Sequence, residues 1–274
     1  KKGKIVVSLP GVPFEMKGLM SDIVLPKIEA IFKLPPIAHK TLVTFGIGES
    51  MLADLIKDFE SSLPENIKLA YLPNHGIVRL RLTAEHTVKN DFQSSLEKQF
   101  ETLKTLVKDY LVAEDDLTME KITGQLLLSK KQKLAVAESC TGGYISHLIT
   151  SLSGSSEWFC GGTIAYSNEL KTGQLHVNPS IIDKWGAVSE EVVLQMAQGL
   201  FKTTNAENAI AVSGIMGPGG GTDEKPVGTV WVAAGNKNNL ITKKFHFRFD
   251  RHKNIQVAAM NALNLLRTTL TQDA

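Results

Sequence analysis

Ser139 and Cys140 are two adjacent nucleophilic side chains that stand where an apolar run meets a glycine pair. The run Leu134–Ala137 predicts a buried strand, and Tyr144–Leu152 carries apolar residues at helical spacing. In open α/β sheets, ligands bind at the carboxyl ends of strands, and a helix amino terminus offers N–H donors to an anion or oxyanion. The residues expected to form this part of a site are Glu138, Ser139, Cys140, Thr141, Gly142 and Gly143.

The residue spacing is compatible with two interpretations of this junction. One is a catalytic loop in which Ser139 attacks a substrate held against backbone N–H groups. The other is a loop in which Thr141 only caps the following helix and no chemistry takes place.

A second junction could supply the base that a serine nucleophile needs. The run Thr163–Tyr166 predicts a strand, and Asn168–Leu175 predicts a short helix. Lys171 lies just over one turn into that helix, so its side chain could point back toward the strand end. A partly desolvated lysine can take the serine proton, and Tyr166 can donate a hydrogen bond. A surface lysine beside a half-buried tyrosine is the alternative.

A glycine-rich loop and an arginine are candidates for holding an anionic group. Five of the ten residues from Ser213 to Thr222 are glycine, which is typical of backbone that wraps a ligand such as phosphate, although no Walker sequence follows. Arg251, at the last strand-to-helix junction, could hold a phosphate or carboxylate by two hydrogen bonds, while Asp250 could simply cap the helix. The further substrate-binding residues expected are Asn168, Ser213, Gly214, Gly217, Gly219, Gly220 and Arg251.

Composition narrows the class of protein and its surroundings. The 274 residues carry 30 basic against 28 acidic side chains, without the basic excess typical of nucleic-acid binders. Only two cysteines are present, which favours a reducing, cytoplasmic compartment, and no apolar run is long enough for a membrane span. The seven histidines show no metal-ligand spacing, so we expect neither a metal nor a cofactor. The chain opens without methionine and reads as a fragment.

The order of predicted elements indicates three units. Residues 1–35 combine a strand over Lys4–Leu9 with a helix over Phe14–Phe32 that Pro26 should break or kink. Residues 36–114 predict a small α+β domain with a hairpin around Asn74-His75-Gly76 and a helix over Asn90–Tyr110. Residues 115–274 alternate strands and helices, which predicts a three-layer α/β/α domain with a largely parallel sheet.

Four motifs together resemble one family closely. They are AESCTGG (137–143), GGTIAYSNELK (161–171), SGIMGPGGGT (213–222) and KPVGTVWVA (225–233). They resemble the carboxyl-terminal, nicotinamide-nucleotide amidase domain of the CinA competence/damage-inducible family. TFGIGES (44–50) resembles the KH-like domain of the same proteins, and SLPGVPFEMKGLM (8–20) resembles the end of their molybdopterin-binding-like first domain.

The resemblance implies an activity and roles for particular residues. It implies hydrolysis of the carboxamide of nicotinamide mononucleotide to nicotinic acid mononucleotide and ammonia, a step of pyridine nucleotide salvage. It assigns catalysis to Ser139, Lys171 and Tyr166, and we expect Arg251 and the glycine loop to hold the 5′-phosphate. A homodimer is a further expectation for a small α/β domain of this kind.

Two other functions compete with the amidase. A Ser-Tyr-Lys oxidoreductase is one, but Tyr166 and Lys171 are five residues apart where such enzymes use four, and no dinucleotide glycine motif opens the chain. The other is a catalytically weak protein that acts in competence or DNA repair by binding nucleic acid or protein. Arg79, Arg81 and Lys89 make only a thin basic face for that role, and the middle domain lacks a GXXG loop.

Overall fold

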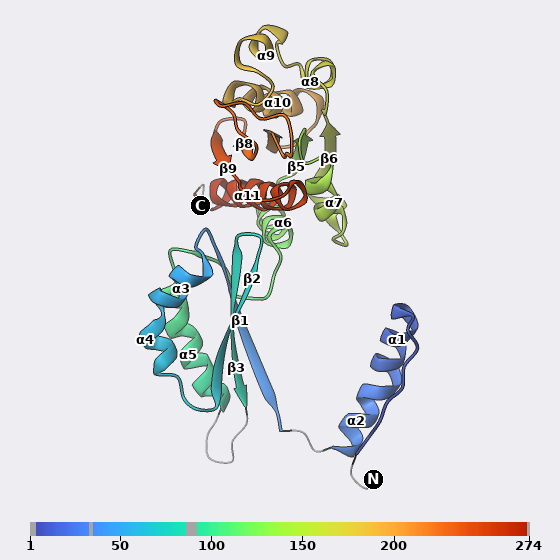
Figure 1. Cartoon of the computed structure of the whole chain (residues 1–274), viewed down its shortest axis with the longest axis vertical. Helices are drawn as coiled ribbons and strands as arrows, with labels where there is room; N and C mark the ends of the chain where they lie inside the picture. Colours follow the sequence, from blue (N-terminus) through green and yellow to red (C-terminus); the bar gives the residue numbers. More distant parts are fainter. Residues whose placement is uncertain (1–3, 33–34, 86–91, 273–274) are drawn as a thin grey trace.

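The computed structural model describes residues 4–32, 35–85 and 92–272. Figure 1 shows two bodies, each built around its own β-sheet, with a pair of amino-terminal helices standing to one side. The four-stranded sheet belongs to the middle of the chain and the five-stranded sheet to its carboxyl-terminal part. The predicted mixed α/β class, with a KH-like domain before a three-layer domain, is confirmed.

The amino-terminal segment differs from its prediction in two ways. Residues 4–9 form no strand, and Val6 is 92% exposed. A strand needs a neighbour for its backbone hydrogen bonds, and none of the described residues supplies one here. The expected helix forms as α1 (Pro13–Leu19) and α2 (Leu25–Ile31), joined by a π-helical turn over Met20–Val24. Pro26 lies in the first turn of α2, directly after the π-helical turn, so the helical path changes at the place where Pro26 was expected to break or kink it.

The middle domain packs helices on an antiparallel sheet. Its order is β1 (Ile37–Phe45), α3 (Glu49–Leu55), α4 (Lys57–Ser61), β2 (Ile67–Asn74), β3 (Ile77–Glu85), α5 (Phe92–Leu106) and β4 (Leu111–Ala113). The strands pair in the order β2-β3-β1-β4, and the predicted hairpin turns at His75 and Gly76, both with positive φ.

Two details of this domain were not anticipated, and one expectation falls outside the described residues. Helices α3 and α4 are separated at Ile56, whose ψ of 15° is not helical. The short strand β4 carries too few residues to show a pattern. The start expected for α5 at Asn90 lies outside the described residues, as does Lys89.

The carboxyl-terminal domain alternates helices and strands around a mixed sheet. Its elements are α6 (Met119–Lys130), β5 (Leu134–Glu138), α7 (Tyr144–Thr150), a 3-10 turn (Ser155–Glu157), β6 (Phe159–Ile164), α8 (Asn168–Leu175), α9 (Pro179–Trp185), α10 (Glu190–Thr203), β7 (Asn208–Gly214), β8 (Thr229–Asn236), β9 (Leu240–His246) and α11 (Arg251–Gln272). The strand order is β6-β5-β7-β8-β9.

The expectation of a largely parallel sheet is wrong for half of this sheet. Strand β5 is parallel to β6 and β7, but β8 is antiparallel to both β7 and β9. Parallel neighbours need a crossover, usually a helix, and none lies between β7 and β8 or between β8 and β9. The glycine-rich loop and a tight turn make these connections instead.

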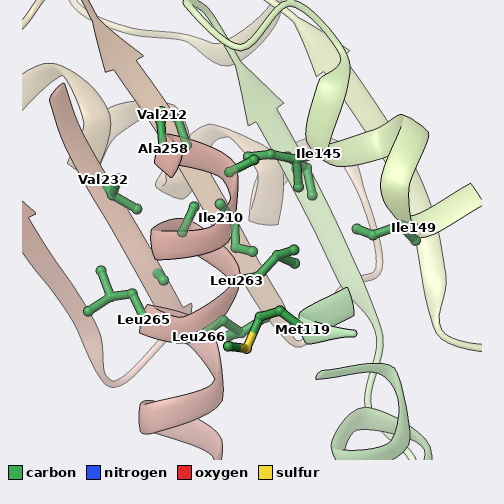
Figure 2. Packing of buried hydrophobic residues seen from close by; sticks show 14 of the residues in the cluster. Met119, Ile145, Ile149, Ile210, Val212, Val232, Ala258, Leu263, Leu265 and Leu266 are labelled. Atoms are coloured by element: carbon green, nitrogen blue, oxygen red, sulfur yellow. The ribbon is translucent and has the colours of Figure 1, made fainter. Parts of the chain in front are cut away.

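The sheet divides the domain into two apolar layers. Strand β5 sends Leu134 and Val136 into a cluster with α6, α7 and α11, and sends Ala135 and Ala137 into a cluster with α8, α9 and α10. Figure 2 shows the first of these clusters, with Met119, Ile145 and Leu263 converging beneath the strands. The apolar layers fix the positions of the helices that carry the polar residues described below.

The two domains also share buried apolar contacts. Val43 of β1 and Ile77 of β3 belong to the same cluster as α6 and α11, and Phe45, Val112 and Ala113 pack against it. In Figure 1 the end of the four-stranded sheet lies against α6 and α11 accordingly. The described part of the middle domain is therefore anchored to the carboxyl-terminal domain by hydrophobic packing.

Gly199 on α10 is a position where the layers allow no side chain. An added Cβ would lie 2.0 Å from the carbonyl oxygen of Leu175, at the end of α8. We expect Gly199→Ala to destabilise the carboxyl-terminal domain by about 1–3 kcal/mol, because α8 and α10 must separate. Urea unfolding followed by tryptophan fluorescence measures this, since Trp158, Trp185 and Trp231 all lie in this domain.

Gly173→Ala on α8 is the matched control. Nothing lies within 4 Å of its Cβ position, so alanine should be neutral or stabilise the helix by about 0.5–1 kcal/mol. Equal effects of the two substitutions would contradict the packing argument.

Candidate active site

A crevice opens at the carboxyl ends of β5 and β6. These two strands are parallel neighbours, and the loop after β5 leads to α7 on one face of the sheet while the loop after β6 leads to α8 on the other. Loops that diverge in this way leave a gap, which is where open α/β sheets bind ligands. A cavity of about 200 Å³ lies there, lined by Ser139, Cys140, Tyr166, Asn168, Lys171, Ala187, Val188, Ser213, Gly214, Met216 and Arg251.

The two-residue period of β5 separates Glu138 from Ser139. Leu134 and Val136 face α7 and α11, and Glu138 continues that series. Ala135 and Ala137 face the opposite layer, so the next position in their series, Ser139, lies on the side of α8. The strand thus directs the hydroxyl toward the helix that carries Lys171.

Glu138 does not line the cavity, in contrast to the substrate-binding role expected for it. Its buried carboxylate accepts hydrogen bonds from the backbone N–H groups of Gly143, Ile145 and Ser146 at 2.8–3.1 Å, and from the Ser146 hydroxyl at 2.7 Å. The charge therefore occupies the amino terminus of α7 and satisfies its orphan donors. The Glu138 carboxylate thus occupies the position at the amino terminus of α7 where an anionic ligand could otherwise bind. It also holds the 139–143 turn in place.

Thr141 likewise differs from its expected role as a helix cap. Gly143, with φ of 95°, takes the cap position of α7 without a side-chain hydrogen bond. The Thr141 hydroxyl is buried and has no hydrogen-bond partner among the described residues. A threonine is thus no cap here because the Glu138 carboxylate reaches the same N–H groups.

Two backbone N–H groups of the turn remain available for an oxyanion. Gly142 donates to the Ser139 carbonyl oxygen at 3.2 Å, and Gly143 donates to Glu138. Within the described chain, the N–H groups of Cys140 and Thr141 have no acceptor. In the serine enzymes of the α/β-hydrolase fold, the residue after the nucleophile supplies an oxyanion donor. Of the N–H groups from Cys140 to Gly143, the first two are thus free for this role within the described chain.

Lys171 is buried at the opposite wall of the cavity. Its Nζ atom donates to the carbonyl oxygens of Ala165 at 3.0 Å, Tyr166 at 3.3 Å and Ser167 at 3.5 Å. The side chain therefore turns back from α8 to the end of β6, as the sequence predicted. Burial lowers the pKa of the Lys171 ammonium, although Cys140 and Glu169 partly oppose this. A lysine with a lowered pKa is a stronger candidate for a proton acceptor at neutral pH.

Tyr166 and Arg251 meet at the mouth of the cavity. Arg251 Nη2 donates to the Tyr166 hydroxyl at 3.2 Å, and Nη1 donates to the Gly217 carbonyl oxygen at 2.8 Å. Tyr166 is 60% exposed, so both groups are reachable from solvent. Asp250 caps α11 by accepting from the Lys253 N–H at 2.9 Å, which was the alternative expected for that residue.

The glycine loop contributes less of the wall than expected. Ser213 and Gly214 line the cavity, and the Ser213 hydroxyl donates to the Ala187 carbonyl oxygen at 2.7 Å. Gly217 takes part through its contact with Arg251, whereas Gly219 and Gly220 are exposed and do not line the cavity. Gly142 and Gly143 also lie outside the lining.

Sequence reasoning missed three residues of the wall. Ala187 and Val188 precede α10 and carry no polar group that could draw attention. Met216 lies within the quoted glycine loop, but its side chain is buried in the apolar cluster with α11.

Cys140 lines the same cavity but is kept from ionising. Its side chain is 6% exposed and packs in the apolar cluster. Burial raises the pKa of the thiol to about 12, and the Glu138 carboxylate adds to this effect. The thiolate is the nucleophilic form of cysteine, so the more reactive atom of the Ser139–Cys140 pair is held inactive.

Comparison with known proteins shows which family the chain belongs to. The family described as the CinA C-terminal domain matches residues 116–270, and the family described as the damage-inducible protein CinA KH domain matches residues 39–113. The chain belongs to the CinA family. Two CinA-like proteins, from Cytophaga hutchinsonii and Flavobacterium psychrophilum, are 42% and 41% identical over 98% and 97% of this chain. The chain spans 65% and 64% of their lengths.

Solved structures of CinA superfamily proteins match just over half of this chain and nearly all of their own length. Competence damage-inducible protein A (ComA) from Klebsiella pneumoniae is 32% identical, with a TM-score of 0.54 over 57% of this chain and 98% of that protein. Competence/damage inducible protein CihA from Agrobacterium tumefaciens is 33% identical, with a TM-score of 0.53 over 57% and 98%. The fold seen here is thus that of CinA superfamily proteins.

The described residues contain neither a membrane-spanning helix nor a cluster of metal-ligating side chains. No helix within residues 4–32, 35–85 and 92–272 is both long and apolar enough to cross a bilayer. The same ranges contain no group of three or more His, Cys, Asp or Glu side chains that could hold a metal ion.

The burial of Cys140 predicts a difference in alkylation between the two cysteines. At pH 8, iodoacetamide should modify the exposed Cys160 in the folded protein and leave Cys140 unmodified, because Cys140 is buried and its pKa is raised to about 12. Peptide mass spectrometry measures both sites, with labelling in urea as the control in which both react. Equal labelling of the folded protein would contradict the assignment of Cys140 as a protonated, buried thiol.

Proposed function

We propose that the protein is a nicotinamide-nucleotide amidase, which converts nicotinamide mononucleotide and water to nicotinic acid mononucleotide and ammonia. The observation that carries the proposal is the meeting of Ser139, Lys171 and Tyr166 around one cavity, with Lys171 desolvated. These three residues stand at the positions where the CinA amidase motifs place the catalytic groups. The proposal thus joins a local geometry to the family's known chemistry.

Acylation begins with proton transfer from Ser139 to Lys171. The neutral Nζ of Lys171 takes the hydroxyl proton while Ser139 Oγ bonds to the carboxamide carbon. Negative charge moves to the carboxamide oxygen, where the free N–H groups of Cys140 and Thr141 can donate to it. The Lys171 ammonium then gives its proton to the amide nitrogen, the C–N bond breaks, and ammonia leaves an ester on Ser139.

Deacylation reverses the proton path with water as the nucleophile. Lys171 takes a proton from water as the hydroxide oxygen bonds to the ester carbon. The ester C–O bond then breaks, and Ser139 Oγ recovers its proton from Lys171. The product is a carboxylic acid that ionises at neutral pH. Tyr166 assists at the cavity mouth, where its hydroxyl can orient the substrate or pass a proton.

The shape of the site suggests how a mononucleotide would lie. A cavity of about 200 Å³ is smaller than the roughly 300–1,000 Å³ of whole-ligand pockets. It suits the nicotinamide ring, with the ribose phosphate outside at Arg251, which offers a guanidinium for a two-pronged contact. Arg251 would exchange its bonds to Gly217 and Tyr166 for bonds to phosphate.

A nucleic-acid role finds less support in the middle domain. Arg79 already pairs with Asp116 at 2.6 Å, so part of the thin basic face is neutralised by the chain itself. Affinity for nucleic acid comes largely from basic side chains that displace counterions from the phosphates, and this face has few such side chains.

The first test is ammonia release from nicotinamide mononucleotide. We expect turnover by the wild type, a loss of at least about 10³-fold in Ser139→Ala, because the acyl acceptor is gone, and at most a modest loss in Cys140→Ser. The two variants differ by neighbouring residues in one turn, and circular dichroism checks that both fold. Normal turnover by Ser139→Ala, or a folded wild type without turnover, would refute the proposal.

The second test is the pH dependence of kcat/KM. A base acts only when unprotonated, so kcat/KM should rise with pH through the pKa of Lys171, which burial places below its ordinary value. Lys171→Arg keeps the cation but cannot be a base near neutral pH, so its rate should fall by about 10²–10⁴-fold. An unchanged acid limb in Lys171→Arg would assign the base to another group.

A further inference from the structure

A second cavity lies between the two domains, away from Ser139. It has a volume of about 320 Å³ and is walled by the end of β1 and the α5–β4 turn on one side and by β9 and α11 on the other. This volume falls within the range of small-molecule pockets, unlike the smaller cavity at Ser139. Pockets of this size occur preferentially at domain interfaces.

Arg267 of α11 supplies a charge to this cavity without a balancing acid. Its side chain is half-buried, and its Nε donates to Asn264 Oδ1 at 2.9 Å. No carboxylate of the described residues lies within ion-pair distance of it, whereas Arg79 has Asp116. Burial lowers the pKa of the Arg267 guanidinium, although such a group stays protonated. A desolvated cation without a counter-ion is costly, so an anion from solution would be stabilised there.

The helix face beside Arg267 is polar and leaves hydrogen-bonding capacity unused. Asn261 donates to the Val257 carbonyl oxygen, and Thr268 donates to that of Leu265, both within α11. No hydrogen bond from Asn261, Asn264 or Thr268 reaches the middle domain within the described chain. A half-buried polar face without partners across an interface is available to a ligand.

The remaining walls of the cavity carry aromatic residues, which favour a flat ring in the ligand. Together with Arg267, they also carry a net positive charge, which favours an anionic ligand. Phe45 and Tyr110 line the cavity from the middle domain, and Phe245, whose ring stacks on Phe247, lines it from β9. Lys243 adds a second cation, and Asp109 is the acid on the opposite wall. We propose that this interdomain cavity binds a phosphorylated ring compound of mononucleotide size, with Arg267 on the phosphate and the aromatic side chains against the ring.

This site is separate from the proposed amidase site. Arg251 and Arg267 stand on the same helix, 16 residues apart, which is about 24 Å at 1.5 Å per residue. Binding at Arg267 therefore neither requires nor excludes the amidase activity.

Isothermal titration of the full chain with adenosine monophosphate tests the proposal, with inorganic phosphate titrated in parallel. We expect adenosine monophosphate to bind with a Kd below about 1 mM, and inorganic phosphate to bind at least tenfold more weakly because it lacks the ring. Arg267→Gln should weaken binding at least tenfold. Asp109→Asn should strengthen it several-fold, because a repulsive charge leaves the opposite wall.

Arg251→Gln separates the two sites: it removes the cation proposed to hold a mononucleotide phosphate at the amidase site, and the binding that depends on Arg267 should persist in it. Thermal melts without ligand show whether each variant folds, and Asp109→Asn gives an answer even if Arg267→Gln unfolds. Absence of binding at 10 mM, binding that survives Arg267→Gln, or equal affinity for phosphate and adenosine monophosphate would overturn the proposal.

Discussion

The buried carboxylate of Glu138 is the interaction on which the site depends. Three backbone N–H groups and one hydroxyl converge on it, so the chain leaving β5 must turn sharply and start α7 in one position. That turn holds Ser139 at the cavity and leaves the N–H groups of Cys140 and Thr141 unused. Hydrogen bonds to a charged acceptor are stronger than neutral ones, and this acceptor is shielded from water. The Glu138 carboxylate thus fixes the geometry of the turn from outside the cavity lining.

Burial also shifts the pKa values of the two titratable groups that line the cavity with Ser139. Removal from water raises the pKa of Cys140 and lowers that of Lys171, because it disfavours the charged form in both cases. One physical effect therefore keeps the thiol protonated and favours the unprotonated amine. A serine–lysine pair gains from such surroundings, whereas a cysteine nucleophile would need a nearby cation to ionise it.

Much of this arrangement was predictable from the sequence because parallel strands end at the same edge of a sheet. Ser139 follows β5, while Tyr166 and Lys171 follow β6, so their meeting follows from strand direction. The position of Glu138 was missed because both faces of β5 are apolar, and the alternation that separates Glu138 from Ser139 is hidden in the run Leu134–Ala137. Ala187 and Val188 reach the cavity only through tertiary packing, which no local pattern records.

Other differences have equally specific causes. Strands β7, β8 and β9 are antiparallel because loops, not helices, connect them. The apolar pattern of a strand in the sequence does not show whether it runs parallel or antiparallel to its neighbours. Residues 4–9 have the composition of a strand, but composition supplies no hydrogen-bonding neighbour. The interdomain cavity combines residues from four distant segments, none of which forms a motif alone.

The sharing of Val43 and Ile77 between the two domains has a consequence for dividing the chain. A cut near residue 115 would leave Ser139, Lys171 and Arg251 in one piece, yet it would strip the covering from an apolar area on the side of α6 and α11. Newly bared apolar surface promotes association between molecules. A cut there would therefore expose, on the side of α6 and α11, apolar surface that Val43 and Ile77 cover in the longer chain.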